Sequence, residues 1–299
     1  MRPSIHPRAW LELVRLPNLP TVPGGVAAGY LLGLAARPAS GLARFPAAAA
    51  AVTLLYMAGL ALNDWADAGI DARERPGRPI PSGRLTRRQA LWASMALGAA
   101  GMAFAGVAGW ACAAVCAAVA LTAAAYDLAS VRGSPIGWLL MGACRVLTVL
   151  AGAAAASSWA GLAEEGVLVA GGILGAYTVT ISGLAAREAD LHVPGARRWL
   201  PPGVAVVGAA GVYGMGLPGA TSSALMLLAG ALSGVGAVAG LTGAQPPERV
   251  GRAVGALIRG MIPLQAALCL AAGVSTPMAA GVIALYPVSW LLSGRFHAS

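Results

Sequence analysis

The stretch PAAAAAVTLLYMAGLALNDWADAGID, residues 46–71, decides the fold class. Its first part, residues 46–62, carries no charge and is long enough to cross the hydrocarbon core of a bilayer as a helix. Apolar residues follow one another there without the alternation that a membrane β-strand shows. One asparagine and three aspartates come after the apolar run. The sequence therefore predicts a transmembrane helix that ends in an acidic segment.

The rest of the chain has a similar composition. Of its 299 residues, 58% are hydrophobic and only 10% are charged, and the mean hydropathy is +0.73. A soluble domain needs a more highly charged surface, so we expect an all-α polytopic membrane protein in which a single domain covers residues 1–299. We predict nine or ten transmembrane helices, at residues 19–35, 46–62, 88–106, 108–125, 135–157, 166–184, 201–217, 222–241, 254–273 and 276–293.

The charge distribution predicts the orientation. The formal net charge is +9, and all twenty basic residues are Arg. Most of them fall at the N-terminus or in the loops 63–87, 126–134, 185–200 and 242–253, which the predicted spans place on one side of the membrane. The positive-inside rule makes this side cytoplasmic, in a bacterial-type inner or plasma membrane, and leaves Glu164 and Glu165 on the other side. Arginines scattered over short loops do not form one basic face, so we expect no nucleic-acid partner, and no segment indicates an obligate protein partner.

The acidic segment predicts a metal site. Asn63, Asp64, Asp67 and Asp71 would fall within a sector of about 100° if the helix continues. Like charges at such spacing raise each other's cost of ionisation unless a cation lies between them. Magnesium prefers one or two carboxylates together with water and phosphate oxygens, and therefore suits this pattern.

Arginines follow the acids directly. Arg73, Arg75, Arg78 and Arg84 alternate with prolines, which end the helix and stiffen the loop. Guanidinium groups offer forked donors to phosphate oxygens, so the order of acids and then arginines favours a metal-bridged diphosphate. The alternative is a solvated, salt-bridged loop that merely obeys the positive-inside rule. Charges placed at the membrane boundary at helical spacing favour the functional interpretation.

These residues carry a family resemblance. The pattern NDxxDxxxD at residues 63–71, followed by RPIPSG at 78–83, resembles the first motif of the UbiA superfamily of intramembrane prenyltransferases, and RLPNLPTVP at 15–23 is similar to the family's entry into its first helix. The resemblance implies a helical bundle around a central cavity. It also implies that Asp64, Asp67 and Asp71 bind magnesium and a prenyl diphosphate, with Asn63 assisting and Arg78 contacting phosphate.

The second motif of the family departs from its pattern here. The family has two aspartates in a DxEGD motif after the sixth helix, whereas this chain reads AREADLHVPGARR at residues 186–198. Ala186 replaces the first aspartate, while Glu188 and Asp190 remain as candidate ligands of a second magnesium. We expect Arg187 to supply fixed positive charge to the diphosphate.

Two further candidates lie near the fourth predicted helix. Tyr126 stands where the family places a tyrosine before a basic residue, and Arg132 is the nearest basic residue in place of the expected lysine. Both are predicted to contact the substrate. The alternative is a tyrosine at the membrane interface beside a positive-inside arginine.

Two polar residues lie in or beside apolar spans. Arg145 lies about ten residues into the fifth predicted span, where a charge is costly, and we expect it to face the interior and meet the diphosphate or an acidic group of the acceptor. The alternative is a pairing with a lone acid or with carbonyl groups. Asn18 is predicted either to line the pocket or to cap the first helix.

The resemblance implies magnesium-dependent transfer of a prenyl group from a prenyl diphosphate to an aromatic or other small lipophilic acceptor within the bilayer. Asp64, Asp67, Asp71 and Arg145 are the predicted catalytic residues. The alternative is a membrane carrier or transporter of the same fold, or a terpene-cyclase-like protein with a degenerate second motif. The segments RPIPSGR, MGACR and LIRGMIPLQAAL are similar to the EboC-like branch of the superfamily.

Overall fold

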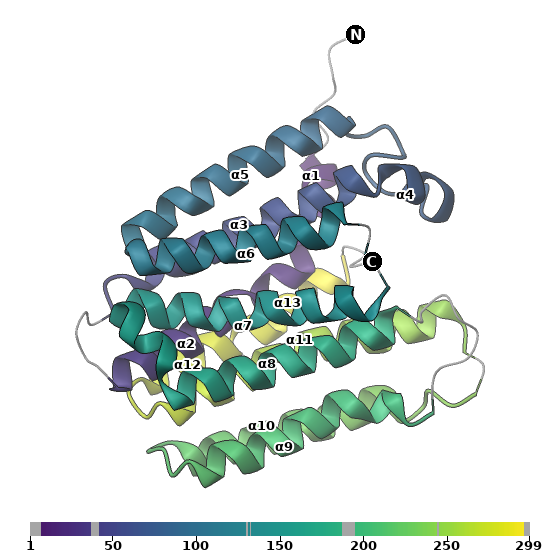
Figure 1. The fold of residues 1–299 in the computed structure, drawn as a ribbon. Coiled ribbons are helices and arrows are strands. Elements are labelled where there is room, and N and C mark those ends of the chain that lie inside the picture. The colour runs from purple at the N-terminus through teal and green to yellow at the C-terminus, as the bar shows by residue number, and fades with distance from the viewer. Residues whose placement is uncertain are drawn as a thin grey trace.

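The computed structural model describes residues 7–36, 42–129, 131, 133–186, 195–243 and 245–295. Every regular element in these ranges is a helix (Figure 1). Nine helices of the described chain are long and apolar enough to cross a membrane. The prediction of an all-α polytopic membrane fold is therefore confirmed.

The helices follow the predicted spans closely. Their bounds are α1 Pro7–Leu13, η1 Leu16–Thr21, α2 Pro23–Ala36, α3 Phe45–Ala66, α4 Ala68–Glu74, α5 Arg87–Ala108, α6 Trp110–Leu128, α7 Pro135–Ser157, η2 Ser158–Ala163, α8 Glu165–Ala185, η3 Arg197–Trp199, α9 Leu200–Gly214, α10 Ala220–Val238, α11 Pro247–Ala271, α12 Thr276–Ile283 and α13 Leu285–Ser293. The predicted span 201–217 corresponds to α9, whose 15 residues keep it out of the set of nine. The predicted span 276–293 is divided at Ala284 into α12 and α13.

The helix α2 lies at the centre of the bundle. It packs against α7, α11, α3 and α8. On one side α3 packs against α5 and α6, at the top of Figure 1, and at the opposite edge α9 and α10 form a pair that α11 and α8 join to the rest. Two cores result, one around α8 and α11 and one between α3, α6 and α7. This arrangement brings the N-terminal segment, the end of α3 and the end of α6 together at one end of the bundle.

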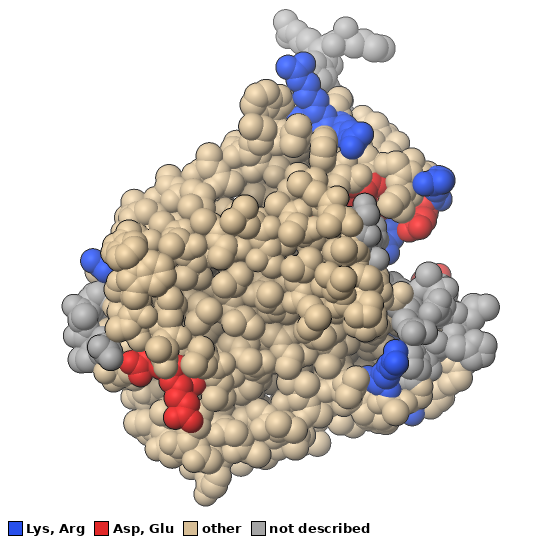
Figure 2. Space-filling view, in the orientation of Figure 1, with Lys and Arg blue, Asp and Glu red and all other residues tan. Residues whose placement is uncertain are grey.

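Charge is concentrated at the two ends of the bundle. Figure 2 shows an uncharged belt between an end where most of the visible arginines gather and an end that carries an acidic patch. The short helix α4 lies at the arginine-rich end, on the right of Figure 1. Glu164 and Glu165 lie at the start of α8, at the opposite end. The separation of charge along the bundle agrees with the predicted loop assignment.

Two glycines let α2 and α7 pack closely. A Cβ atom on Gly29 would overlap the Val149 carbonyl, and a Cβ atom on Gly152 would overlap the Val26 carbonyl. Small residues allow helix backbones in a membrane to approach in this way. The contact holds α2 at the centre of the bundle, and therefore fixes where the N-terminal segment enters it.

This close contact gives a stability prediction. Replacing Gly29 or Gly152 by Ala should lower the free energy of unfolding by about 1–3 kcal/mol, because the helices must move apart to admit a methyl group. Thermal unfolding in detergent micelles measures the loss. Gly172, on α8, has no atom within 4 Å of an added Cβ, so Gly172→Ala is the matched control and should be neutral or slightly stabilising. Equal effects at all three positions would contradict the packing described.

Candidate active site

The acidic segment lies at the junction of two helices. The helix α3 ends at Ala66, Asp67 turns the chain with φ −80° and ψ 1°, and α4 begins at the next residue. The helix therefore does not continue through the acidic segment, because the turn at Asp67 gives α4 a separate start. The three aspartates nevertheless remain buried, with exposed fractions of 5% for Asp64, 9% for Asp67 and 1% for Asp71.

Arg78 lies between two of these carboxylates. Its Nη1 atom donates to Asp71 Oδ2 at 2.8 Å and to Asp64 Oδ1 at 3.2 Å. The Arg78 side chain is only 9% exposed. Burial lowers the pKa of the Arg78 guanidinium and the charge of Arg15 lowers it further, whereas Asp64 and Asp71 raise it. An arginine stays protonated at neutral pH, so Arg78 compensates two buried acids.

The loop after α4 is folded so that Arg78 points back to the acids. The Leu85 amide donates to the Pro79 carbonyl, and Gly83 adopts a φ of +75°, which favours glycine. Leu85 is buried against Ala61 in a small apolar cluster beneath the loop. The next helix then starts with a capping box between Thr86 and Gln89. These contacts give the loop one conformation and hold Arg78 in place.

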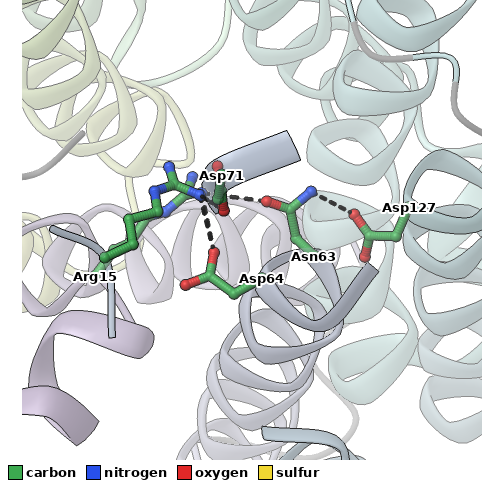
Figure 3. Close-up of polar contacts among 6 residues, drawn as sticks. Arg15, Asn63, Asp64, Asp71 and Asp127 are labelled. Carbon is green, nitrogen blue, oxygen red and sulfur yellow. Dashed lines mark hydrogen bonds and ion pairs between the residues drawn. The ribbon is translucent and has the colours of Figure 1, made fainter. Parts of the chain in front are cut away.

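The N-terminal segment contributes a second cation. Arg15 Nη2 donates to Asn63 Oδ1 at 3.2 Å and lies 3.7 Å from Asp64 Oδ1 (Figure 3). Arg15 has a left-handed backbone with φ 45° and ψ 57°, an uncommon conformation for a residue other than glycine. The segment is tied to the loop because Arg84 Nη1 donates to Glu12 Oε2 at 2.6 Å. The position of Arg15 is therefore coupled to the loop that carries Arg78.

Asn63 joins this cation to a fourth acid. Asn63 Nδ2 donates to Asp127 Oδ1 at 3.0 Å, and Asp127 lies in the last turn of α6 (Figure 3). Arg15 offers only donors and a carboxylate is an acceptor, so this arrangement fixes the orientation of the Asn63 amide. The polar network thus connects the N-terminal segment, α3, α4 and α6.

Two buried polar atoms of the network have no hydrogen-bond partner among the described residues. They are Asp71 Oδ1 and Arg78 Nη2. Buried polar atoms are nearly always paired, so an unpaired acceptor beside an unpaired donor needs an explanation. A cation at Asp71 together with an anion at Arg78 would satisfy both atoms.

The structure brings together only some of the predicted site residues. Asn63, Asp64, Asp71 and Arg78 share the network, and Asp67 is buried beside them. Within the described ranges, no three or more His, Cys, Asp or Glu side chains are grouped closely enough to hold a metal ion in this conformation. The three aspartates therefore do not form a ready-made cage, because Arg78 lies between Asp64 and Asp71.

Other predicted residues lie outside this network. Arg73 is exposed on α4. Tyr126 lies in the last turn of α6, where its ring lies close to Gly137. Asn18 is buried within η1, several residues before α2 begins at Pro23, so it does not stand at the capping position of α2. The predicted residues Arg132, Arg187, Glu188 and Asp190 lie outside the described residues.

Arg145 points into the bundle, as predicted. Its Nη1 and Nη2 atoms donate to the carbonyl and the hydroxyl of Thr21 at 3.2 and 3.4 Å. Its guanidinium carbon lies 5.6 Å from the centre of the Tyr56 ring. Among the described residues, Arg145 therefore pairs with a carbonyl group, which is one of the two predicted alternatives.

The sequence patterns do not identify two residues of the network as site residues. Arg15 belongs to the segment that is similar to the family's entry into its first helix, and Asp127 follows the candidate residue Tyr126. Asp127 is an acid at the end of an apolar span, the feature that identified Asp64. That signal was available in the sequence, whereas the contact between Arg15 and Asn63 joins residues 48 positions apart.

Comparison with known proteins identifies a matching family. Residues 22–244 match the model of the UbiA prenyltransferase family. A digeranylgeranylglyceryl phosphate synthase of Methanopyrus kandleri is 40% identical over 110 residues, which are 37% of this chain and 39% of that protein. The synthase of Korarchaeum cryptofilum is 54% identical over 50 residues, which are 17% of this chain and 18% of that protein. The matches thus span well under half the length of these relatives.

Solved structures share the fold. A UbiA homologue from Archaeoglobus fulgidus bound to DMAPP and Mg²⁺ superposes with a TM-score of 0.62 at 14% identity, over 92% of this chain and 99% of that one. A structure reported for digeranylgeranylglyceryl phosphate synthase has a TM-score of 0.55 at 16% identity, over 88% and 97% of the two chains. At such low identity the likeness concerns the fold alone.

The pairing of Arg78 with buried acids gives a prediction about the loop. Arg78→Met leaves two buried carboxylates without their cation, and should destabilise the loop by about 3–5 kcal/mol in metal-free protein. Cleavage within residues 75–86 by a broad-specificity protease should then accelerate by roughly a hundredfold to a few thousandfold. Arg73→Met is the control, because the Arg73 side chain is exposed on α4 and its loss should change stability by less than about 0.5 kcal/mol. Similar cleavage rates for the two variants would contradict the role given to Arg78.

Proposed function

Because the chain belongs to the UbiA prenyltransferase family, we propose that it transfers a prenyl group from a prenyl diphosphate to a lipophilic acceptor within the membrane, with magnesium as cofactor. The observation that carries the proposal is the buried network of Arg15, Asn63, Asp64, Asp71 and Arg78 at the end of the α3 span. It combines acids that suit a metal with arginines that suit a phosphate, beside helices that suit an isoprenoid chain.

The residues present fit magnesium. Asp64 and Asp71 are hard oxygen ligands that share one guanidinium nitrogen, and Asp71 Oδ1 has no partner. Magnesium is usually bound through one or two carboxylates and the oxygens of a phosphorylated substrate, so a cage of three acids is not required. We infer that Asp64, Asp67 and Asp71 hold the ion, with Glu188 and Asp190 as ligands of a second ion. When bound, magnesium supplies positive charge that stabilises the departing diphosphate.

The arginines of the site hold the diphosphate. Arg78 and Arg15 would turn donors from the carboxylates to the phosphate oxygens, and Arg78 Nη2 is already without a partner. The bond from C1 of the prenyl chain to the diphosphate oxygen breaks, and its electron pair leaves with the diphosphate, where both guanidinium groups stabilise the growing charge. The apolar helices exclude water from the allylic cation. The acceptor then forms the new bond to C1 and loses a proton.

The branch and the acceptor are narrower questions. The relatives named above are digeranylgeranylglyceryl phosphate synthases, whereas RPIPSGR, MGACR and LIRGMIPLQAAL favour the EboC-like branch. We propose geranylgeranyl diphosphate as the first donor to test, because the names of these relatives refer to a geranylgeranyl product. Ala186 stands in place of the first aspartate of the second motif. The alternative function is therefore a membrane carrier of the same fold that lacks turnover.

Loss of an acidic residue should abolish turnover. With labelled geranylgeranyl diphosphate, magnesium and a panel of acceptors, Asp64→Ala and Asp71→Ala should each lower prenyl transfer on the order of 100-fold or more, because the charge on the leaving group is no longer balanced. Asp64→Asn keeps the shape and should lose a similar amount. Glu165→Ala, at the opposite end of the bundle, should stay within about twofold of wild type. Activity of the Asp64 variants close to wild type would refute the metal assignment, and a wild-type protein that binds the diphosphate without turnover would favour the carrier.

The predicted orientation can be tested with cysteine substitutions. We propose that the arginine-rich end faces the cytoplasm. A membrane-impermeant maleimide added to intact cells should label Glu165→Cys at once, and Gly77→Cys only after the membrane is opened. Cys112, Cys116 and Cys269 are buried and Cys144 is half-buried within α7, so the wild-type background should be low. The reverse labelling pattern would show the opposite orientation.

A further inference from the structure

A cavity of about 280 Å³ opens between the end of α10 and the first turns of α11. We call it the α10–α11 cavity. Small residues leave the space open, and two arginines stand in its wall; these residues are Gly236, Gly240, Ala253, Ala256, Arg249 and Arg252. The two helices carry none of the residues of the polar network at the end of α3. The cavity is therefore a separate feature of the molecule.

The α10–α11 cavity lies at the arginine-rich end of the bundle. Gly166, at the acidic start of α8, lies near the side chains of Met215 and Leu217, which precede α10. The helix α10 therefore begins at the acidic end, and its 19 residues carry the chain about 28 Å toward the other end. This length matches the hydrocarbon core of a bilayer of about 30 Å. The cavity thus lies at the level of the lipid headgroups.

The two arginines of the cavity have no acidic partner. Arg249 and Arg252 are both exposed, and neither forms an ion pair with an acid of the described chain. Glu248, the acid of α11, is exposed and pairs with neither of them. Residues three apart share a face of a helix, so two positive charges face one cavity. An anion between them would remove their repulsion.

The missing side chain at Gly240 positions one of these cations. Arg249 Nη2 lies 2.9 Å from the place that a Cβ atom on Gly240 would take. The guanidinium therefore lies across the backbone that follows α10. The positive-inside rule explains arginines at this end of the bundle, but it does not require them to line a cavity. Arg88, at the start of α5, is equally exposed and lies outside the lining of this cavity.

An apolar stripe leads along α10 to the cavity. Its residues Leu225, Leu228, Leu232 and Val235 have exposed fractions of 65%, 40%, 72% and 37%. Their spacing of three and four residues places them on one face of α10, and the stripe ends beside Gly236. A ligand with an anionic head and an apolar chain would contact both the arginines and the stripe. A soluble phosphate would contact only the arginines.

We propose that the α10–α11 cavity binds the headgroup of an anionic phospholipid. Arg249 and Arg252 donate to the phosphate oxygens, for which guanidinium groups are suited, and an acyl chain lies along the stripe of α10. Basic pockets between membrane helices bind anionic headgroups in this way. The inference goes beyond the proposed function, because this lipid is neither a substrate nor a product of prenyl transfer.

Lipid retention by the purified full-length protein tests the proposal. Native mass spectrometry from detergent compares phosphatidylglycerol with phosphatidylcholine of the same acyl chains, supplied in equal amounts. The wild-type protein should retain phosphatidylglycerol in preference by at least about tenfold, and Arg249→Met and Arg252→Met should each lower this preference about fivefold. Gly236→Leu keeps both charges but fills the cavity, and should also lower the preference. No atom lies within 4 Å of an added Cβ at Gly236, so the fold should accept this change.

Controls distinguish a built site from general surface charge. Arg88→Met removes one exposed arginine at the same end of the bundle and should keep the preference within about twofold of wild type. Melting temperatures identify variants that fail to fold. Absence of a preference in wild type would overturn the inference, as would an equal loss in Arg88→Met or an unchanged preference in Gly236→Leu. Displacement of the lipid by excess glycerol 3-phosphate would also overturn it, because the ligand would then be a soluble phosphate.

Discussion

The site depends on the compensation of buried charge at the edge of a membrane. Asp64, in the last turn of α3, and Asp71, on α4, are buried where neither water nor lipid can stabilise them, and Arg78 supplies the missing charge. This requirement explains the fold of the loop, the left-handed Arg15 and the N-terminal segment that is bound to the loop through Glu12. Under the proposed function, a metal ion would replace Arg78 as the cation beside these acids when the substrate binds.

Irregular backbone inside the bundle has a second consequence. The segment Leu16–Thr21 leaves carbonyl groups that α-helical hydrogen bonds do not satisfy, and side chains from distant helices reach them. Ser289 donates to Pro17, and Gln265 and Arg145 donate to Thr21. Helices separated by much of the chain are thereby joined at one point within the apolar interior.

The sequence predicted the helices and the acidic segment well, because hydropathy and spacing are local properties. The burial of Asp64 and Asp71 and the interior position of Arg145 also follow from the cost of charge in lipid. The turn at Asp67 was not predicted, since no proline or glycine stands at that position. The contacts of Arg15 with Asn63, and of Asn63 with Asp127, depend on how α3 and α6 pack, which the sequence alone does not reveal. Magnesium binding by the aspartates remains a proposal.

We propose that the acids of α3 and α4 bind a prenyl diphosphate through a divalent cation. Calorimetric titration of the purified protein with geranylgeranyl diphosphate, with and without magnesium, tests this proposal. Binding should weaken at least about tenfold when magnesium is removed. Equal affinity under both conditions would contradict it.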